Sequence, residues 1–282
     1  MKIRTFYKIF YEHRLLKAHL LNKIYIIFCL PLNYLINKFF LESKRDLDIL
    51  SSKENLLFEK DLNFLFENFN SDKGDLYINQ YQKPIKRDKK KKIGHKYHKF
   101  YEKYFYDIKD RKVDILEIGA FKGNATASFY FYFKNSNIIS GDIFPDLFRY
   151  NSKRIKNIYL DNSKENDLKK KIINTNLKFN IIIEDAGHYL KDQIISLFIL
   201  FRSLKSGGFF VIEELDFPDT RQDMNVLNEK PTLRDILKCI MNRENFNSKY
   251  INQEDKKYFL DNFKEIKIFK GNYNEIAFIE KK

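Results

Sequence analysis

Short apolar runs, separated by longer segments with helical periodicity, fill the chain from residue 113 onwards. Residues 113–123 predict a buried strand, a glycine turn and the start of a helix. Two further strands are predicted at residues 137–143 and 157–163, which reach the acidic side chains of Asp142 and Asp161. Such alternation of strands and helices is typical of parallel sheets.

Residues 179–188 predict the fourth strand, which stops on acid and runs into a helix, and residues 207–215 predict the fifth. Between them, residues 190–204 are long and apolar enough for a crossover helix, so both strands should end on the same edge of the sheet. Residues 266–280 contain two short strands around a Gly-Asn turn, which is a hairpin pattern. These elements predict an α/β fold: a doubly wound, mostly parallel, seven-stranded Rossmann-like sheet with an antiparallel edge.

Two segments of different composition precede the sheet. Residues 1–50 are a basic and apolar helical extension, and residues 51–110 are a helical lead-in with a basic loop, ahead of the sheet domain at 111–282. Helices are predicted in the lead-in at residues 56–69 and 95–105. The two histidines of the second helix are interpreted as ordinary helix residues.

The extension itself has two patterns. Residues 1–22 are basic with apolar residues at helical spacing, and residues 24–40 are strongly apolar but interrupted by Pro31 and other polar positions. Pro31 is expected to end or kink any helix, and no apolar run reaches the roughly 18 residues of a membrane span. A signal peptide is disfavoured because the apolar part starts late and no small-residue cleavage site follows. Two interpretations remain: a helical pair packed on the sheet domain or a partner subunit, and an amphipathic segment resting on a membrane surface.

Composition limits the cellular location and the partners that we expect for the protein. The chain has 282 residues and two cysteines, Cys29 and Cys239, that match no metal spacing, so a cytoplasmic location is expected, at the inner face of the membrane if the extension binds one. The net charge is +14, but the basic residues are spread along the whole chain, which indicates a solvated surface. No specific nucleic-acid partner is therefore expected, and a homo-oligomer is left open.

Acidic side chains gather where the fourth and fifth strands end. Asp185 follows the fourth strand, and Glu213 and Glu214 close the fifth. Because adjacent parallel strands lie about 4.8 Å apart, the three carboxylates should meet at the edge where open α/β sheets bind ligands. His188 adds an imidazole three residues after Asp185. Such a cluster predicts a bound divalent cation.

A glycine turn follows the first strand in the form E-x-G-x-x-x-G, made by Glu117, Gly119 and Gly123. The turn lets backbone approach a ligand, but it lacks the second glycine of the dinucleotide fingerprint, so a cofactor without phosphates fits better. Asp142, at the end of the second strand, is placed to accept hydrogen bonds from both ribose hydroxyls.

Asp161 and Ser163 end the third strand, where they can reach an adenine ring. Alone, a strand-end aspartate is more often a helix cap. In this order, however, the glycine turn, an acid for the ribose (Asp142) and two polar residues for the adenine (Asp161 and Ser163) match S-adenosylmethionine binding in a class I methyltransferase.

The motifs resemble a known enzyme family. Residues from about 70 to 281 are similar to the magnesium-dependent O-methyltransferases that act on deoxysugars of macrolide antibiotics, of the mycinamicin and macrocin type, and to relatives in bacterial polysaccharide loci. The similarity is carried by D-K-G (72–74), H-K-Y (95–97), L-E-I-G (116–119), G-D-I (141–143), D-A-G-H (185–188), L-K-S-G-G (204–208), V-I-E-E-L (211–215) and the C-terminal E-I-A-F-I-E-K.

The resemblance implies metal-assisted methylation of a sugar hydroxyl, in a surface or capsular glycan or its precursor. It implies that Asp185, Glu213 and Glu214 bind Mg²⁺ and that His188 is the catalytic base. The chain departs from the family between Asp185 and His188, and again at Glu214, where the family usually has Asp. The longer Glu214 changes how that position would hold a metal.

Two other readings share the fold. One is a nucleic-acid methyltransferase, but the D/N-P-P-Y loop that methylates exocyclic amines is absent after the fourth strand, and so is a Pro-Cys nucleophile. The other is a non-catalytic scaffold of a glycan-assembly complex. Such a scaffold would be free to lose the acidic and histidine positions, which are intact.

Overall fold

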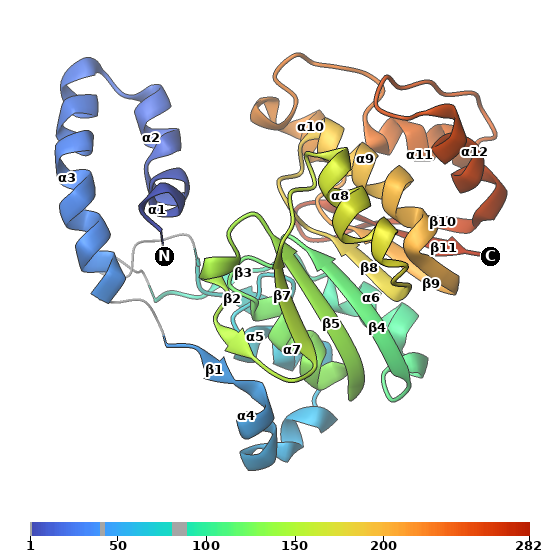
Figure 1. Cartoon of the computed structure of the whole chain (residues 1–282), viewed down its shortest axis with the longest axis horizontal. Helices are drawn as coiled ribbons and strands as arrows, with labels where there is room; N and C mark the ends of the chain where they lie inside the picture. Colours follow the sequence, from blue (N-terminus) through green and yellow to red (C-terminus); the bar gives the residue numbers. More distant parts are fainter. Residues whose placement is uncertain (1, 40–42, 81–88) are drawn as a thin grey trace.

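The computed structural model describes residues 2–39, 43–80 and 89–282, and its centre is one seven-stranded sheet (Figure 1). Its strands are β4 (Lys112–Ile118), β5 (Asn135–Asp142), β7 (Ile155–Tyr159), β8 (Phe179–Glu184), β9 (Leu204–Ile212), β10 (Phe263–Lys270) and β11 (Glu275–Lys281). They lie in the order β10-β11-β9-β8-β4-β5-β7, with β4, β5, β7, β8 and β9 parallel and the β10–β11 hairpin antiparallel to β9. The predicted doubly wound α/β fold is confirmed.

Helices cover both faces of the sheet because strand residues alternate between two apolar cores. Ile115 and Ile183 belong to one core, which they share with α5 (Leu62–Asn68), α6 (His98–Phe105) and α7 (Asn124–Tyr132). Leu116 and Ile182 belong to the other, which they share with α8 (Glu165–Lys171), α9 (Leu190–Leu200), α11 (Leu233–Met241) and α12 (Gln253–Asn262).

The winding of the sheet reverses at β4. The chain runs outward through β5 and β7 and then returns to β8, on the other side of β4. There the Asp185 N–H donates to the Ile118 carbonyl oxygen at 2.9 Å, which ties the ends of β8 and β4 together. Doubly wound sheets bind ligands at such a switch point, so the predicted site residues gather at this edge.

The lead-in packs on the sheet through α5 and α6. The helix predicted at residues 56–69 is broken in two, because a 3₁₀ turn at Asn55–Glu59 ends before Asp61 caps α5. The Asp61 carboxylate accepts a hydrogen bond from the Phe64 N–H at 2.7 Å. The predicted basic loop around residues 83–92 lies mostly outside the described residues. The shorter elements are α4 (Leu47–Lys53), α10 (Phe217–Thr220), β2 (Leu76–Tyr77) and β3 (Lys92–Ile93).

The N-terminal extension is a helical hairpin of α1 (Ile3–Phe10), α2 (Glu12–Lys17) and α3 (Leu20–Phe39) (Figure 1). Of the two expected effects of Pro31, a helix end is wrong, since α3 continues through Pro31 for 20 residues in all, and a kink stays a prediction. Its polar positions are accommodated because the Asn33 and Asn37 side chains donate to carbonyl oxygens one turn back, at 2.9 and 2.7 Å. By length and composition α3 could cross a membrane, contrary to the expectation from uninterrupted apolar runs.

Lys2, just before α1, joins the hairpin to the sheet domain. The Lys2 N–H donates to Asp146 Oδ2 at 3.0 Å. The chain then re-enters the sheet domain through β1 (Arg45–Asp46), which pairs in parallel with β6 (Tyr150–Asn151). The divisions at residues 50 and 110 stay predictions.

Candidate active site

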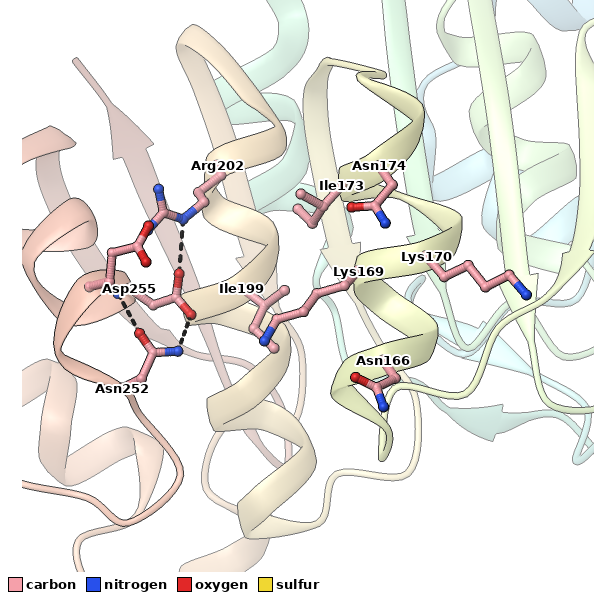
Figure 2. A pocket seen from close by; sticks show the side chains of 10 residues that line it. Asn166, Lys169, Lys170, Ile173, Asn174, Ile199, Arg202, Asn252 and Asp255 are labelled. Carbon is pink, nitrogen blue, oxygen red and sulfur yellow. Dashed lines mark hydrogen bonds and ion pairs between the residues drawn. The ribbon is translucent and has the colours of Figure 1, made fainter.

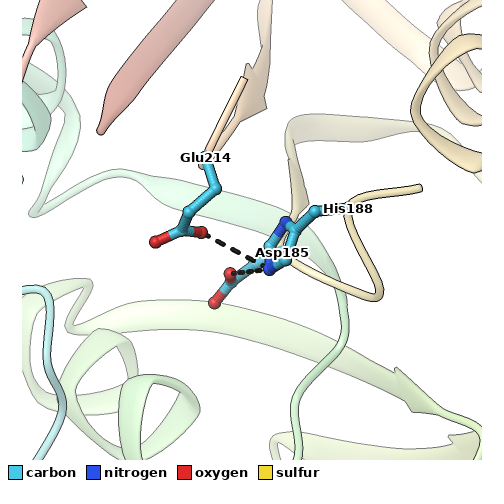
Figure 3. Close-up of side chains that lie close together, drawn as sticks. All are labelled: Asp185, His188 and Glu214. Carbon is cyan, nitrogen blue, oxygen red and sulfur yellow. Dashed lines mark ion pairs between the residues drawn. The ribbon is translucent and has the colours of Figure 1, made fainter. Parts of the chain in front are cut away.

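Asp185, His188 and Glu214 converge beyond the carboxyl ends of β8 and β9 (Figure 3). His188 Nε2 lies 3.8 Å from Asp185 Oδ1 and 3.5 Å from Glu214 Oε2. One ligand atom from each residue falls within 4.8 Å of the others. The structure therefore brings together three of the four residues predicted for this edge.

The backbone of two of these residues is unusual. His188 and Glu214 have φ values of +56° and +45°, a left-handed region that disfavours side chains and recurs at functional sites. The Gln193 amide donates to the Glu214 carbonyl oxygen at 3.1 Å. The His188 ring packs edge-on against Phe217, with 5.1 Å between ring centroids. These contacts hold the imidazole and the carboxylate in place beside Asp185.

Glu213, the fourth predicted residue, is held by a buried lysine. Lys73 Nζ donates to Asp185 Oδ2 and, at 2.6 Å, to Glu213 Oε2, and the lysine side chain is only 2% exposed. The other Glu213 oxygen accepts from the Tyr101 hydroxyl at 2.5 Å. Both Glu213 oxygens thus have protein partners, and its role as a metal ligand stays a prediction. The sequence marks Lys73 only as part of the D-K-G motif (72–74), and nothing in that motif predicts that its side chain reaches the acidic cluster.

Burial and Lys73 together set the charges of the cluster. Burial disfavours the charged form of Lys73, but Asp185 and Glu213 outweigh it and raise the lysine pKa well above its usual value. Burial opposes the ionised form of Asp185 too, yet Lys73 and His188 hold the pKa of that carboxyl below its usual value. Burial raises the pKa of Glu213 to about 8 and that of Glu214 well above its usual range. Burial also lowers the pKa of His188 to about 4, so near neutral pH the imidazole is uncharged and can accept a proton.

The donor set suits a divalent cation. Glu214 Oε2 is buried and accepts no hydrogen bond from any described residue. A buried oxygen without a partner costs stability, and hard divalent cations take carboxylate oxygens as ligands. Asp185 and Glu214, with the His188 nitrogen beside them, could therefore hold such an ion.

His95 is a further member of the site. The prediction of one helix over residues 95–105 is wrong at its start, since α6 begins at His98 and Lys96 has a left-handed φ of +60°. His95 therefore lies in the loop, with its Nε2 3.4 Å from Glu214 Oε1. The Glu214 carboxylate sits between two imidazoles, while His98 is a helix residue as predicted.

Gly119 and Gly123 are required by packing inside the protein as well as by the turn. Their φ values are +92° and +82°, and Gly123 is the residue that precedes α7. A Cβ atom at Gly119 would overlap the Asp185 carbonyl oxygen, and one at Gly123 would overlap the Phe148 ring. Gly119 thus lets the loop after β4 lie directly against the loop after β8, which the sequence pattern alone does not show.

Asp142 and Glu117, two acids predicted to bind the cofactor, accept hydrogen bonds from nearby donors. Asp142 accepts the backbone N–H groups of Phe121 and Phe144, both at 2.7 Å, and burial, which those bonds oppose, raises its pKa. Each oxygen keeps a lone pair for another donor. Glu117 accepts from the Thr126 hydroxyl, and burial raises the pKa of Glu117 to about 7.

Asp161 and Ser163 bind each other at the end of β7. The Ser163 hydroxyl and N–H donate to Asp161 Oδ1 at 2.5 and 3.1 Å, and Lys164 Nζ lies 2.9 Å from the other oxygen. Burial would raise the pKa of Asp161, but these hydrogen bonds outweigh it and lower the pKa. The pair forms a local turn in the wall of a cavity.

Two adjoining cavities contain most of the predicted residues. The larger, of about 950 Å³, is lined by Gly119, Asp142, Asp161 and Ser163 among others. The smaller, of about 730 Å³, is lined by Lys73, His95, Glu117, His188 and Glu214 among others. Both are lined by Gly119 and Asp185 and, from α1, by Lys8 and Ile9. Gly123 and Glu213 line neither.

A third cavity, of about 730 Å³, lies between α8, α9 and α12 and contains none of these residues (Figure 2). Arg202 donates to Asp255 at 2.8 Å, and the Asn252 amide donates to the same carboxylate at 2.6 Å. These polar groups are satisfied within the protein, so the cavity is not a candidate for the site.

No family model matches the chain. A curated relative, the 8-demethyl-8-alpha-L-rhamnosyl tetracenomycin-C 2'-O-methyltransferase of Streptomyces olivaceus, is 27% identical over 128 residues, which are 43% of this chain and 33% of that protein. The solved MycE methyltransferase from the mycinamycin biosynthetic pathway is 21% identical. It covers 79% of this chain, with TM-scores of 0.57 for the complex with Mg and SAH and 0.58 for the complex with Mg, SAH and mycinamycin VI.

The chain spans about a third of the length of the curated relative (33%) and about half of the MycE chain (55% and 54%). At this identity the likeness to MycE shows a shared fold. The protein therefore has a Rossmann-like methyltransferase fold, preceded by the N-terminal helical hairpin.

Proposed function

We propose that the chain is an S-adenosylmethionine-dependent O-methyltransferase that methylates a sugar hydroxyl with the help of Mg²⁺. The proposal rests on the two adjoining cavities, which share a wall at Gly119 and Asp185. One cavity has the glycine turn and strand-end acids expected around the cofactor, and the other has a base beside oxygen ligands. Support comes from the relatives, a 2'-O-methyltransferase of a rhamnosyl tetracenomycin and a methyltransferase solved with Mg and SAH.

In this proposal S-adenosylmethionine occupies the larger cavity. The turn at Gly119 brings backbone close to the ligand. Asp142 accepts the ribose hydroxyls on the lone pairs that its two backbone donors leave unused. Asp161 and Ser163 form the wall beside the adenine.

The acceptor binds in the smaller cavity. Asp185 and Glu214 would hold Mg²⁺, with Glu213 as the third predicted ligand, and the ion would make a sugar hydroxyl more acidic. His188 takes the hydroxyl proton at Nε2, the nitrogen that faces Asp185 and Glu214. The oxygen then forms a bond to the methyl carbon as the carbon–sulfur bond breaks, leaving S-adenosylhomocysteine, a methyl ether and a proton on His188. The remaining residues align the two reactants.

We also propose that the acceptor belongs to a surface or capsular glycan or its precursor, and that the enzyme works in the cytoplasm. Cys29 and Cys239 are both free thiols, which fits a reducing compartment.

Isothermal titration with S-adenosylmethionine, with and without Mg²⁺, tests the cofactor half. The wild-type protein should bind, and Asp142→Ala should lose binding. Asp107→Ala, which changes an exposed acid outside both cavities, should keep it. No binding by folded wild-type protein would reject the methyltransferase and leave the scaffold as the better reading.

A further inference from the structure

Helix α3 has two apolar faces, and the structure covers one of them. Ile26, Leu30 and Tyr34 pack on Phe6 and Phe10 of α1. On the opposite side, apolar residues at helical spacing form an outer stripe whose members are 49% to 83% exposed: Leu21, Ile24, Tyr25, Phe28, Leu32, Leu35 and Phe39.

The outer stripe runs the full length of α3, from its first turn to its last residue. In the most apolar 18-residue stretch of the helix, only 6% of the stretch is buried against the rest of the described chain. A continuous apolar surface of this kind marks a site that a membrane or another protein covers.

Charge distinguishes between these two occupants. Residues 1–39 contain seven Lys or Arg residues and a single acid, Glu12. Each basic residue near an anionic lipid surface contributes about 1 kcal/mol of attraction. Two copies of the same basic hairpin would instead repel each other. The charge therefore favours an anionic bilayer over a second copy of the chain.

We propose that the outer stripe docks the protein on an anionic phospholipid bilayer, with α3 lying in the plane of the interface. A helix of this length is about 30 Å long, which would also span the hydrocarbon core. A spanning helix, however, would detach from α1 and place Asn37, now 1% exposed, in lipid. In-plane docking keeps the contacts between α1 and α3.

Docking also orients the site, because α1 contacts α3 and lines the cavities. Lys2, Arg4 and Lys8 line the larger cavity, and Lys8 lines the smaller one as well. None of these three side chains has an ion pair with another described residue, so their charges are free to attract an anionic group into the cavities. If the proposed function holds, the acceptor class that fits is a glycan carried on a lipid.

Cosedimentation of the full chain with phospholipid vesicles tests the docking surface. The protein should bind vesicles of phosphatidylcholine mixed with phosphatidylglycerol, bind phosphatidylcholine alone weakly, and lose binding as salt rises. The double variant Phe28→Asp/Leu32→Asp should partition at least about tenfold less. The matched control, Val226→Asp/Leu227→Asp, changes two apolar residues that are 69% and 77% exposed elsewhere, and it should bind normally. Equal binding by both double variants, or none by the wild type, would overturn the proposal.

Three other roles of α3, as a spanning helix, a dimer contact or a cleaved signal, are tested by separate measurements. Alkaline carbonate should release the protein from cell membranes, whereas retention would show a spanning helix. Light scattering without vesicles should give the same mass for wild type and Phe28→Asp/Leu32→Asp, whereas a dimer lost in that variant would assign the stripe to a second copy. A mature N-terminus beyond α3 would show a cleaved signal. Each of these results would overturn in-plane docking.

Two assays separate this proposal from the enzymatic one. The variant Phe28→Asp/Leu32→Asp should bind S-adenosylmethionine like the wild type, so lost docking with intact cofactor binding leaves the proposed function standing. Wild-type protein that binds vesicles but no cofactor would reject the proposed function and leave the docking proposal standing. Methyl transfer to a lipid-linked sugar in mixed vesicles should fall about tenfold in the docking variant, with transfer to a soluble nucleotide sugar unchanged. Equal rates on both acceptors would reject the lipid-linked class.

Discussion

The two cavities hold their buried carboxylates in different ways. In the larger one, Asp142 accepts two backbone N–H groups that lie 21 and 2 residues away in the chain. Beside the smaller one, Lys73 of its lining donates to Asp185, which lines both cavities, and to Glu213 behind them, residues that follow the lysine by 112 and 140 positions. Backbone groups thus complete the proposed cofactor half, and a side chain from outside the sheet completes the proposed acceptor half.

This difference determines what each half depends on. Backbone donors are present whatever the neighbouring side chains are, whereas an ammonium group is lost with a single substitution. Substitutions in the acceptor half should therefore have the larger effects, and they should act on turnover and folding more than on cofactor affinity.

The variant His188→Ala should show the largest effect. Turnover should fall by about 10²–10⁴-fold because the base is removed. Affinity for S-adenosylmethionine, measured by titration, should stay nearly unchanged, since His188 lines only the smaller of the two cavities. His19→Ala, at an exposed position, is the control. If His188→Ala also lost cofactor binding, the two cavities would not have the separate roles proposed for them.

The variant Lys73→Met should lower the free energy of unfolding by about 3–5 kcal/mol, because it leaves the buried Glu213 and the partly buried Asp185 without their cation. Urea denaturation gives this value. Lys91→Met removes a surface pair with Glu67, whose N···O distance is 3.3 Å, and should cost less than about 1 kcal/mol. Adding Glu213→Gln to Lys73→Met should recover part of the loss. Equal costs for the two lysines would show that Lys73 does not stabilise the acidic edge.

The variant Glu117→Gln should reveal a buried charge whose burial is not offset by the Thr126 hydrogen bond and Lys73. Because the folded-state pKa of Glu117 is raised from 4.5 to about 7, the wild type loses stability as pH rises above the unfolded-state value. The glutamine still accepts from Thr126 but cannot ionise. Between pH 5 and pH 8 the stability difference should therefore shift by about 2 kcal/mol in favour of Glu117→Gln, measured by urea denaturation of the protein without ligand. A difference that does not vary with pH would mean that Glu117 is not ionising in the folded state.

The variant Asp142→Asn should have the smallest of these effects, a loss of cofactor affinity of about tenfold, because one amide oxygen replaces two acceptors. Titration measures the change. Asp161→Asn should weaken binding less, since Asp161 already bonds to Ser163 and Lys164. A larger loss for Asp161→Asn would reverse the roles given to the two acids.

Strand ends were predictable because crossover geometry places consecutive parallel strands side by side and ends them on one edge. That rule alone brings Asp185, His188 and Glu214 together. It does not say which of two successive acids faces the cavity, because successive residues of a strand point to opposite faces. The left-handed backbone of Glu214 decides this, and no local pattern encodes it.

Contacts from outside the sheet could not be predicted. Lys73 lies in a turn, and only the folded lead-in carries its side chain to the acids. His95 was assigned to a helix because its neighbours have helical spacing, but Lys96 turns the backbone first. Proline disfavours helix locally, yet α3 continues through Pro31, where packing of its inner face on α1 outweighs the local preference.

The buried Lys73 has a consequence for a cell that is short of magnesium. A side chain is tethered covalently, so neither chelation nor dilution can remove its charge. The acidic edge keeps one positive group under every ionic condition, and its carboxylates are never left to repel each other alone. The amount of folded protein should therefore depend less on the metal supply than it would at an acidic edge without Lys73 and, if the proposed function holds, scarcity should slow the reaction more than it unfolds the chain.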